Sequence, residues 1–223
     1  MTTFVLVPGG GGHAWDWHRL VPELVRRGQE AVAVELPAGD PAAGLAAYAD
    51  TVAAAIGSRR PVTVVAHSMG GLTAPLVCDR RPVEALVLVN AMIPRPGETG
   101  GDWWTATGQE EAQTAHRAAL GLHGELDDDA VYYHDVPPDV VAEARSLPEE
   151  QTMRPFEEPW PLAGWPDVPT RVLAGRDDRL FPLEFQRRVA AERLGLDVEE
   201  VPGGHCVALS RPVELAEALV AAR

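Results

Sequence analysis

The sequence predicts an α/β fold in which helices flank an open, mostly parallel sheet. Short runs rich in β-branched residues recur along the chain. They are apolar almost throughout rather than alternating, which is typical of strands covered on both faces. Amphipathic stretches separate these runs, and the resulting β-α-β-α order favours parallel strands. With 223 residues, the chain has the length of one well-buried domain, so we expect a single domain over residues 1–223.

Six apolar runs are the expected strands, and five amphipathic stretches are the expected helices. The strands are Phe4–Val7, Ala31–Glu35, Val62–Ala66, Ala85–Val89, Arg171–Ala174 and Val198–Val201. The helices are Trp17–Arg27, Leu45–Ile56, Gly71–Arg80, Leu183–Leu194 and Pro212–Ala222. Pro75 is expected to bend the third helix, because proline lacks the backbone N–H and its ring crowds the preceding turn.

Residues 93–166 interrupt this alternation. The interval has no convincing strand, several helix fragments, many prolines and four of the six tryptophans. A long irregular insertion in a compact domain is usually a functional lid or a disordered segment, and the aromatic content favours an ordered lid. We expect its Trp103, Trp104 and Tyr133 to form an apolar substrate pocket.

The charge of the chain excludes several kinds of protein. The formal net charge is −14, which disfavours a sequence-independent nucleic-acid binder. All 19 basic residues are arginine, and without lysine the chain cannot form a Schiff base or grip phosphate with a P-loop lysine. Residues 98–158 hold 15 acidic residues and three arginines. This segment is either a solvated helical surface or an acidic flap that disfavours anionic ligands.

The two cysteines and the chain start indicate the cellular setting. Cys78 and Cys206 form neither a disulfide framework nor a metal-ligand spacing. The first residues, MTTFVLVPGG, lack the pattern of a secretory signal, and no apolar run is long enough to span a bilayer. We therefore expect a cytoplasmic, soluble protein without metal or cofactor. The sequence leaves a homodimer open.

A serine follows the third expected strand. Ligands of open α/β sheets bind beyond the carboxyl ends of the strands. There the chain reads Ala66-His67-Ser68-Met69-Gly70, close to the G-x-S-x-G turn that raises a nucleophilic serine between a strand and a helix, with alanine in the first glycine's place. A serine that only caps the following helix is the alternative.

An acid and a histidine follow two later strands. A serine hydroxyl needs a base, and the base needs an orienting acid. Asp177 and Asp178 follow the fifth expected strand and compete for the role of acid, and His205 follows the sixth after two glycines. The chain order of serine, acid and histidine matches the nucleophile-elbow hydrolases. A histidine with only a structural role is the alternative for His205.

The glycine run after the first strand suits an oxyanion hole. Such a hole needs two backbone N–H groups aimed at developing charge. Met69, next after the serine, is expected to supply one group, and the loop LVPGGGG has the permissive backbone for the other. A phosphate cradle is the alternative, but the chain has neither a G-x-G-x-x-G that opens a helix nor a lysine.

Together these residues resemble the α/β-hydrolase superfamily, and most closely its small esterase branch with plant methylesterases and hydroxynitrile lyases. The resemblance rests on FVLVPGGGGHAWDWHRLVPEL, VVAHSMGG, the acid loop followed by FPLEFQRR, and GGHCVALSRPVELAEAL. It implies that Ser68 is the nucleophile and His205 the general base. The family's acid lies three residues after the small residue that ends its strand, which implies Asp178. The resemblance also implies oxyanion donors at Gly10 and Met69, and a serine hydrolase that cleaves a small carboxylic ester.

Two departures from the family bear on the reaction. The usual HG opening of the oxyanion loop is Pro8-Gly9 here. The lyases depend on a lysine beside the catalytic histidine and a threonine in the oxyanion loop, where this chain has Cys206 and Gly9. Ester hydrolysis is therefore the leading hypothesis. A non-hydrolytic enzyme of a biosynthetic pathway and a ligand receptor are the alternatives.

Overall fold

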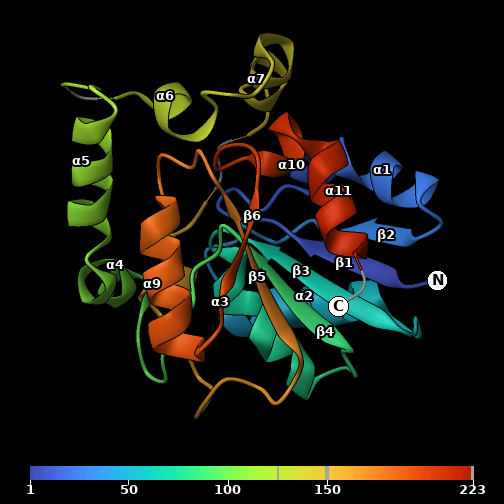
Figure 1. Ribbon diagram of the computed structural model, residues 1–223. Coiled ribbons are helices and arrows are strands. Elements are labelled where there is room, and N and C mark those ends of the chain that lie inside the picture. Colours follow the sequence, from blue (N-terminus) through green and yellow to red (C-terminus); the bar gives the residue numbers. More distant parts are fainter. Residues whose placement is uncertain (125, 149–150, 222–223) are drawn as a thin grey trace.

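A computed structural model describes residues 1–124, 126–148 and 151–221. Its six strands form one sheet in the order β2-β1-β3-β4-β5-β6, and every neighbouring pair is parallel (Figure 1). The strands are β1 (Thr3–Val7), β2 (Glu30–Ala33), β3 (Val62–His67), β4 (Ala85–Val89), β5 (Thr170–Gly175) and β6 (Val198–Val201). The six expected strands are confirmed, with ends that differ by at most two residues.

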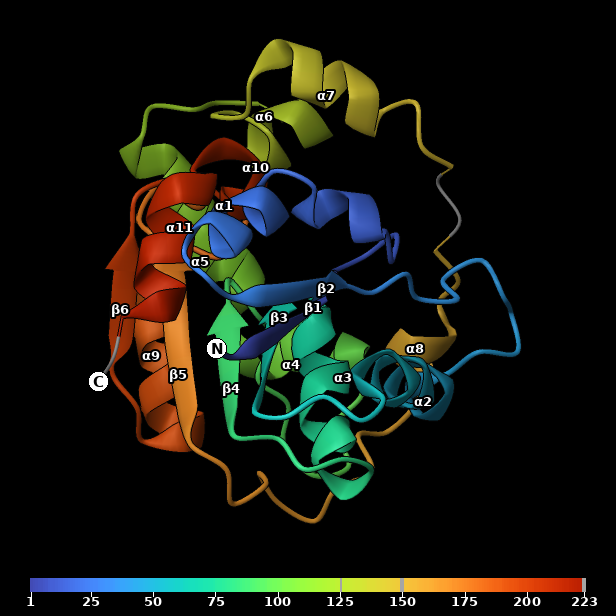
Figure 2. The same cartoon turned by 90° about the vertical axis from the view of Figure 1, so that its right-hand side faces the viewer.

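Helices cover both faces of the sheet. On one face lie α1 (Leu20–Arg26) and α11 (Pro212–Val220), and on the other lie α2 (Leu45–Ile56), α3 (Gly70–Thr73) and α9 (Leu183–Leu194) (Figures 1 and 2). The first expected helix is divided, because Ala14–Trp17 forms a separate 3-10 helix, η1. As expected from Pro75, the helix after β3 also changes form, from α3 to the 3-10 helix η2 (Ala74–Asp79).

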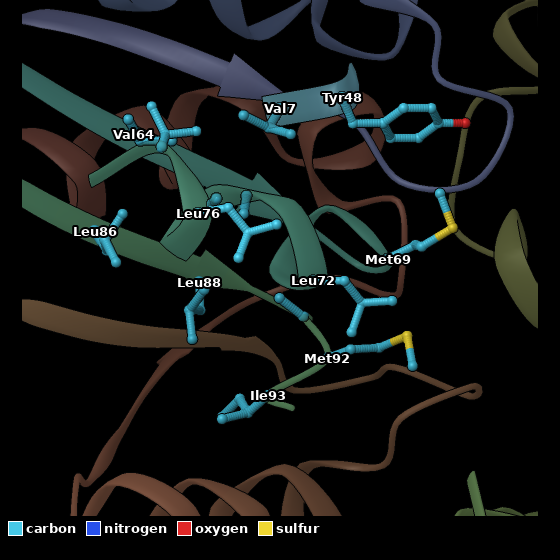
Figure 3. Close-up of a cluster of buried hydrophobic side chains, with 14 of the residues drawn as sticks. Val7, Tyr48, Val64, Met69, Leu72, Leu76, Leu86, Leu88, Met92 and Ile93 are labelled. Atoms are coloured by element: carbon cyan, nitrogen blue, oxygen red, sulfur yellow. The ribbon is translucent and has the colours of Figure 1, made fainter. Parts of the chain in front are cut away.

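The strands are apolar throughout because both of their faces are buried. One cluster joins alternate strand residues such as Val5 and Val64 to α2, α3 and α9, and a second joins Leu6 and Val65 to α1 and α11. Figure 3 shows the first cluster, in which Tyr48 of α2 and Leu72 of α3 pack near Val7, Leu88 and other strand side chains. Met69 and Met92 lie in the same cluster. The core therefore reaches the carboxyl ends of β3 and β4.

The segment over residues 93–166 is helical, and its described residues contain no strand. Its helices are α4 (Gly100–Thr107), α5 (Gln109–Ala119), α6 (Asp128–Tyr132), α7 (Pro138–Ala144) and α8 (Arg154–Glu157). Helices α6 and α7 lie beyond the carboxyl ends of the strands, at the top of Figure 1. Between them, Asp135 accepts a hydrogen bond from the N–H of Gly204 (2.9 Å), just before His205. The segment is thus attached to the loop after β6.

Among the described residues, no helix combines the length and the apolar character that a membrane crossing requires. Cys78 and Cys206 are both free thiols.

Candidate active site

The loop after β1 and the turn after β3 meet at the carboxyl edge of the sheet. Strands β1 and β3 are neighbours, whereas the chain passes through β2 between them. The order of the strands reverses at this point, which is where ligands bind in open α/β sheets. Ser68 stands on the turn after β3 in a left-handed conformation, with φ 51°. This conformation is costly for a residue other than glycine and is typical of functional sites.

Small residues around Ser68 allow the turn to pack tightly. A Cβ on Gly9 would lie 2.9 Å from the Ser68 Cβ, and one on Gly70 would lie 2.6 Å from the Pro8 carbonyl oxygen. A Cβ on Gly71 would overlap the Met92 carbonyl. These three glycines are therefore required by close approach. At Gly10, by contrast, a Cβ would meet no atom within 4 Å.

Three predicted residues form one chain of hydrogen bonds. His205 Nε2 lies 3.1 Å from Ser68 Oγ, and His205 Nδ1 lies 2.9 Å from Asp178 Oδ2. Because an ionised carboxylate only accepts, Nδ1 carries the proton in this arrangement and Nε2 is free to accept from the serine hydroxyl. The other oxygen, Asp178 Oδ1, accepts from the N–H groups of Leu180 (2.8 Å) and Phe181 (2.9 Å). Asp178 is fully buried, so these bonds hold its carboxylate in one orientation.

Asp177, the competing acid, points elsewhere. Its side chain is 47% exposed and pairs with Arg176 at 3.2 Å. Partial burial raises its pKa, but the bond to Arg176 and the attraction of that guanidinium outweigh burial, so the pKa of Asp177 is lowered overall. The geometry thus brings Asp178, not Asp177, to His205.

Asn90 and His67 hold the backbone of His205. The Asn90 side chain, fully buried at the end of β4, donates to the carbonyl oxygens of Gly204 (3.1 Å) and His205 (2.8 Å). It also accepts from the N–H of Gly175 (2.7 Å), so it joins the ends of three strands. His67 Nε2 lies 2.9 Å from the His205 carbonyl oxygen. Burial, and then the nearby His205, lower the pKa of His67 to about 3, so its ring is neutral and Nε2 donates.

The two expected oxyanion donors both lie beside the serine. Gly10 and Met69 line the same cavity as Ser68. Within residues 1–124, 126–148 and 151–221, the N–H groups of Gly10 and Met69 have no acceptor. The neighbouring Gly11 N–H donates to Gln151 Oε1 at 3.1 Å, so its N–H is already engaged.

A cavity of about 610 Å³ opens over the serine. Trp104 and Tyr133 line it, as the sequence predicts. The prediction for Trp103 is wrong, because this side chain is buried behind the lining. Its ring packs on Phe181 at 5.2 Å between centroids, and its Nε1 donates to the Ile93 carbonyl oxygen. Trp103 supports the cavity from behind without reaching the space inside.

Sequence reasoning missed several other residues of the cavity. Tyr132 lines it, with its ring centroid 5.6 Å from that of His205, and Gln151 lines it near the glycine loop. Asp16 of η1 also lines the cavity. Burial raises the pKa of Asp16 to about 7, although the nearby His13 works in the opposite direction. Its position between two tryptophans in Ala14–Trp17 is the sequence signal that could have indicated Asp16 as a cavity residue.

Burial also affects the thiol beside His205. Cys206 lines the cavity, and burial together with the nearby carboxylates of Asp16 and Asp178 raises the pKa of its thiol well above the usual value. Cys206 therefore stays a neutral thiol near neutral pH. No group of three or more histidine, cysteine or acidic side chains suited to a metal ion occurs in the described part of the chain.

Comparisons with known proteins identify the family of the chain. A family model described as "Alpha/beta hydrolase family" matches residues 4–218. Esterase PIR7B of Oryza sativa subsp. japonica is 29% identical over 254 residues, which cover 97% of this chain and 94% of the relative.

Two solved structures share the fold. The crystal structure of polyneuridine aldehyde esterase has a TM-score of 0.77 at 21% identity and covers 99% of this chain and 98% of its own. That of the methylesterase MES16 from Arabidopsis has a TM-score of 0.74 at 20% identity, with coverage of 99% and 98%. The resemblance to small plant esterases that the sequence motifs indicate is thus confirmed.

Proposed function

The chain belongs to the alpha/beta hydrolase family, and on that premise we propose that it is a serine hydrolase of small carboxylic esters that forms an acyl-enzyme intermediate. The hydrogen-bonded chain from Asp178 through His205 to Ser68 is the observation that carries this proposal. An esterase-like hydrolase is also what the similarity to plant esterases supports. In this proposal, Ser68, His205 and Asp178 are a catalytic triad.

Acylation begins when Ser68 Oγ attacks the ester carbonyl carbon. His205 Nε2 accepts the hydroxyl proton as the new C–O bond forms, and the carbonyl oxygen becomes an oxyanion. Asp178 stabilises the imidazolium through the 2.9 Å bond to Nδ1. The tetrahedral intermediate then collapses, the bond to the alcohol oxygen breaks, and His205 returns the proton to that oxygen. The products of this half-reaction are a free alcohol and an acyl-serine.

Deacylation repeats the same steps with water. His205 accepts a proton from a water molecule, whose oxygen attacks the acyl carbon, and it then returns the proton to Ser68 Oγ. The acid leaves and the serine is restored. All of these proton transfers occur at His205 Nε2, so the chemistry needs no proton carrier beyond the residues already in the cavity.

We assign the oxyanion hole to the N–H groups of Gly10 and Met69. Support comes from their position beside Ser68 and from the lack of an acceptor for either group within the described residues. A preorganised donor that binds only the developing charge lowers the barrier directly, and loss of one such donor costs about 10²–10³ in kcat.

We assign residues 93–166 as a lid over the acyl and alcohol groups of the substrate. From this segment, Trp104, Tyr132, Tyr133 and Phe156 line the cavity. Its volume of about 610 Å³ suits a small ester, since ligand pockets are usually 300–1,000 Å³.

Turnover of short p-nitrophenyl esters tests the proposal. We expect hydrolysis by the wild-type protein without added metal or cofactor, and none above background by Ser68→Ala. Mandelonitrile is the matched probe for a lyase. We expect no cyanide release, because the chain has no lysine and the residue after His205 is the neutral thiol of Cys206, so neither supplies a positive charge to departing cyanide. Robust cyanide release, or inertness toward a broad ester panel, would exclude ester hydrolysis as the main activity.

A further inference from the structure

One wall of the cavity carries polar groups that the protein leaves unpaired. We call Asp16, Tyr132 and Tyr133 the wall. All three line the cavity. In the described part of the structure, neither the Asp16 carboxylate nor the two tyrosine hydroxyls take part in any hydrogen bond or ion pair. The Asp16 side chain is partly buried, and a carboxylate withdrawn from water without a donor is costly, so its presence in a ligand cavity suggests that a ligand supplies the missing partner.

The position of Asp16 is fixed by its surroundings. Helix η1 places it between Trp15 and Trp17, and Trp17 is only 1% exposed and belongs to the core. The Asp16 N–H donates to the His13 carbonyl oxygen at 3.2 Å. The backbone of Asp16 is therefore held beside the cavity.

Four titratable groups face Asp16. His13 and Glu35 interact with it electrostatically from the glycine loop and from the chain after β2. The charge of Asp16 also acts on Tyr133, at the end of α6, and on Cys206, before α10. The phenol and the thiol cannot carry a positive charge, and the raised pKa of each keeps it neutral near neutral pH. His13 is already held by Glu35 (3.2 Å) and by the Pro148 carbonyl oxygen (2.9 Å).

The rest of the lining favours a positive ligand group. The rings of Trp104, Tyr132 and Tyr133 line the cavity, and the faces of such rings attract cations. Arg145, the lining arginine, is paired with Asp129 at 2.5 Å. Asp128 adds an exposed carboxylate to the lining. With a net charge of −14 for the whole chain, the field around the cavity attracts cations and repels anions.

We infer that the wall is a subsite for a cationic group, such as a quaternary ammonium, on the ester substrate, with Asp16 as its counter-ion. This inference rests on the proposed ester hydrolysis and narrows its substrates to esters that carry a positive charge. The aromatic rings of the wall would surround the alkyl groups of the cation while Asp16 balances its charge.

Two esters of the same shape test the inference. Choline butyrate and 3,3-dimethylbutyl butyrate differ only in that a positive nitrogen replaces a neutral carbon. We expect the wild-type kcat/KM to favour the choline ester by at least about tenfold, since opposite charges attract strongly where water is partly excluded. In Asp16→Asn, which keeps shape and removes charge, the preference should fall to within about threefold.

The pH dependence of this preference is a second readout. The ratio of the two kcat/KM values cancels any pH effect on the chemical steps, which both esters share. Because the pKa of Asp16 is about 7, the ratio should rise between pH 5.5 and 8.5 as the carboxylate forms. His13 loses its positive charge over the same pH range, which also raises the ratio. The rise of the ratio with pH that remains in Asp16→Asn therefore measures the contribution of His13 alone.

A charge-matched control separates the site from the overall field. Asp197 is exposed in the loop before β6, at the opposite edge of the sheet. Asp197→Asn makes the same change of net charge and should retain the wild-type preference. Equal loss in both variants, or a wild-type ratio near one, would overturn the inference while leaving ester hydrolysis intact.

Measuring binding of the ester to a protein that cannot hydrolyse it makes the test independent of catalysis. In the Ser68→Ala background, calorimetry should show choline butyrate binding at least about tenfold more weakly when Asp16→Asn is added. If neither ester is hydrolysed yet this difference appears, the cation subsite holds and the proposed hydrolysis fails. Equal binding by the two proteins would exclude the subsite.

Discussion

The floor and the wall of the active site differ in whether their polar side chains have hydrogen-bond partners within the protein. We call the lining residues Ser68 and His205, together with Asn90 and Asp178 that are fully buried behind them, the floor. The Asp178 carboxylate accepts from two backbone N–H groups and from His205, and Asn90 uses both ends of its amide. The wall has a carboxylate and two hydroxyls with no partner in the described residues. Full pairing fixes the geometry that proton transfer needs, whereas unpaired groups are available to a ligand.

Backbone placement explains this contrast. The floor residues follow β3, β4, β5 and β6 directly, so the rigid sheet sets their positions. The wall residues belong to η1 and to the end of α6, outside the sheet. Changes to the floor should therefore reduce catalysis or folding, and changes to the wall should alter selectivity.

The largest expected effect comes from breaking the chain of hydrogen bonds in the floor. We expect His205→Ala and Asp178→Asn each to lower kcat on a neutral p-nitrophenyl ester by about three to four orders of magnitude, the scale found for members of such triads. Asp177→Asn is the matched control. It removes the same charge one residue away from a side chain that faces Arg176, so kcat should change by less than about threefold. A larger loss in Asp177→Asn than in Asp178→Asn would contradict the assignment.

Much of the floor can be predicted from the sequence, because the strands that carry its residues can be predicted. The apolar runs define where each strand ends, and parallel strands bring the residues after them to one edge. Ser68, His205 and the Asp177-Asp178 pair were identified in that way. The choice of Asp178 came from family resemblance, since two adjacent carboxylates look alike in sequence and differ only in which one the turn buries.

The wall could not be predicted in the same way. In the helical segment, a tryptophan toward the core and one toward the cavity have the same local pattern, which is why Trp103 was misplaced and Trp104 was not. Their orientation depends on packing against Phe181 and Phe185 of another element. Asp16 was missed because the groups that it meets in the cavity, Tyr133 and Cys206, are far away in sequence.

The next largest effect concerns Asn90, which joins three strand ends. Asn90→Ala leaves the carbonyl oxygen of Gly204 and the N–H of Gly175 without this partner, whereas the His205 carbonyl oxygen keeps its donor His67. Each buried polar group left unpaired costs about 1–3 kcal/mol, so we expect the free energy of unfolding to fall by about 2 kcal/mol or more in urea titrations. Asn90→Gly is the companion variant. Because φ is 48° at this position, glycine should be the better tolerated of the two by roughly 0.5–1 kcal/mol.

Ionisation of Asp16 in the wall should have a smaller effect on the free energy of unfolding. In the unfolded chain the Asp16 carboxyl ionises near pH 4, but in the folded protein burial raises its pKa to about 7. The free energy of unfolding therefore falls as the pH rises from 4 to 7, and it levels off above. Asp16→Asn has no carboxyl group to ionise, so its free energy of unfolding does not fall in this way. Its Tm should exceed that of the wild type by several degrees at pH 8 and match it at pH 4. A lower Tm in the variant at pH 8 would show that the carboxylate has a stabilising partner.

The smallest effect is electrostatic discrimination by the acidic helical segment. At low salt we expect a neutral ester to exceed a carboxylate-bearing ester of similar size by several-fold in kcat/KM. The difference should shrink at about 0.5 M NaCl, where the Debye length is only a few ångströms. Equal values for the two esters at low salt would indicate that the acidic residues form a solvated surface without influence on the cavity.

Ser68 as an activated nucleophile is the central claim, and covalent labelling tests it most directly. Intact-mass analysis after treatment with a fluorophosphonate should show one adduct on the wild-type protein, none on Ser68→Ala, and a greatly slowed reaction in His205→Ala. Labelling that persists in Ser68→Ala, or a folded wild-type protein that remains unlabelled, would contradict the claim.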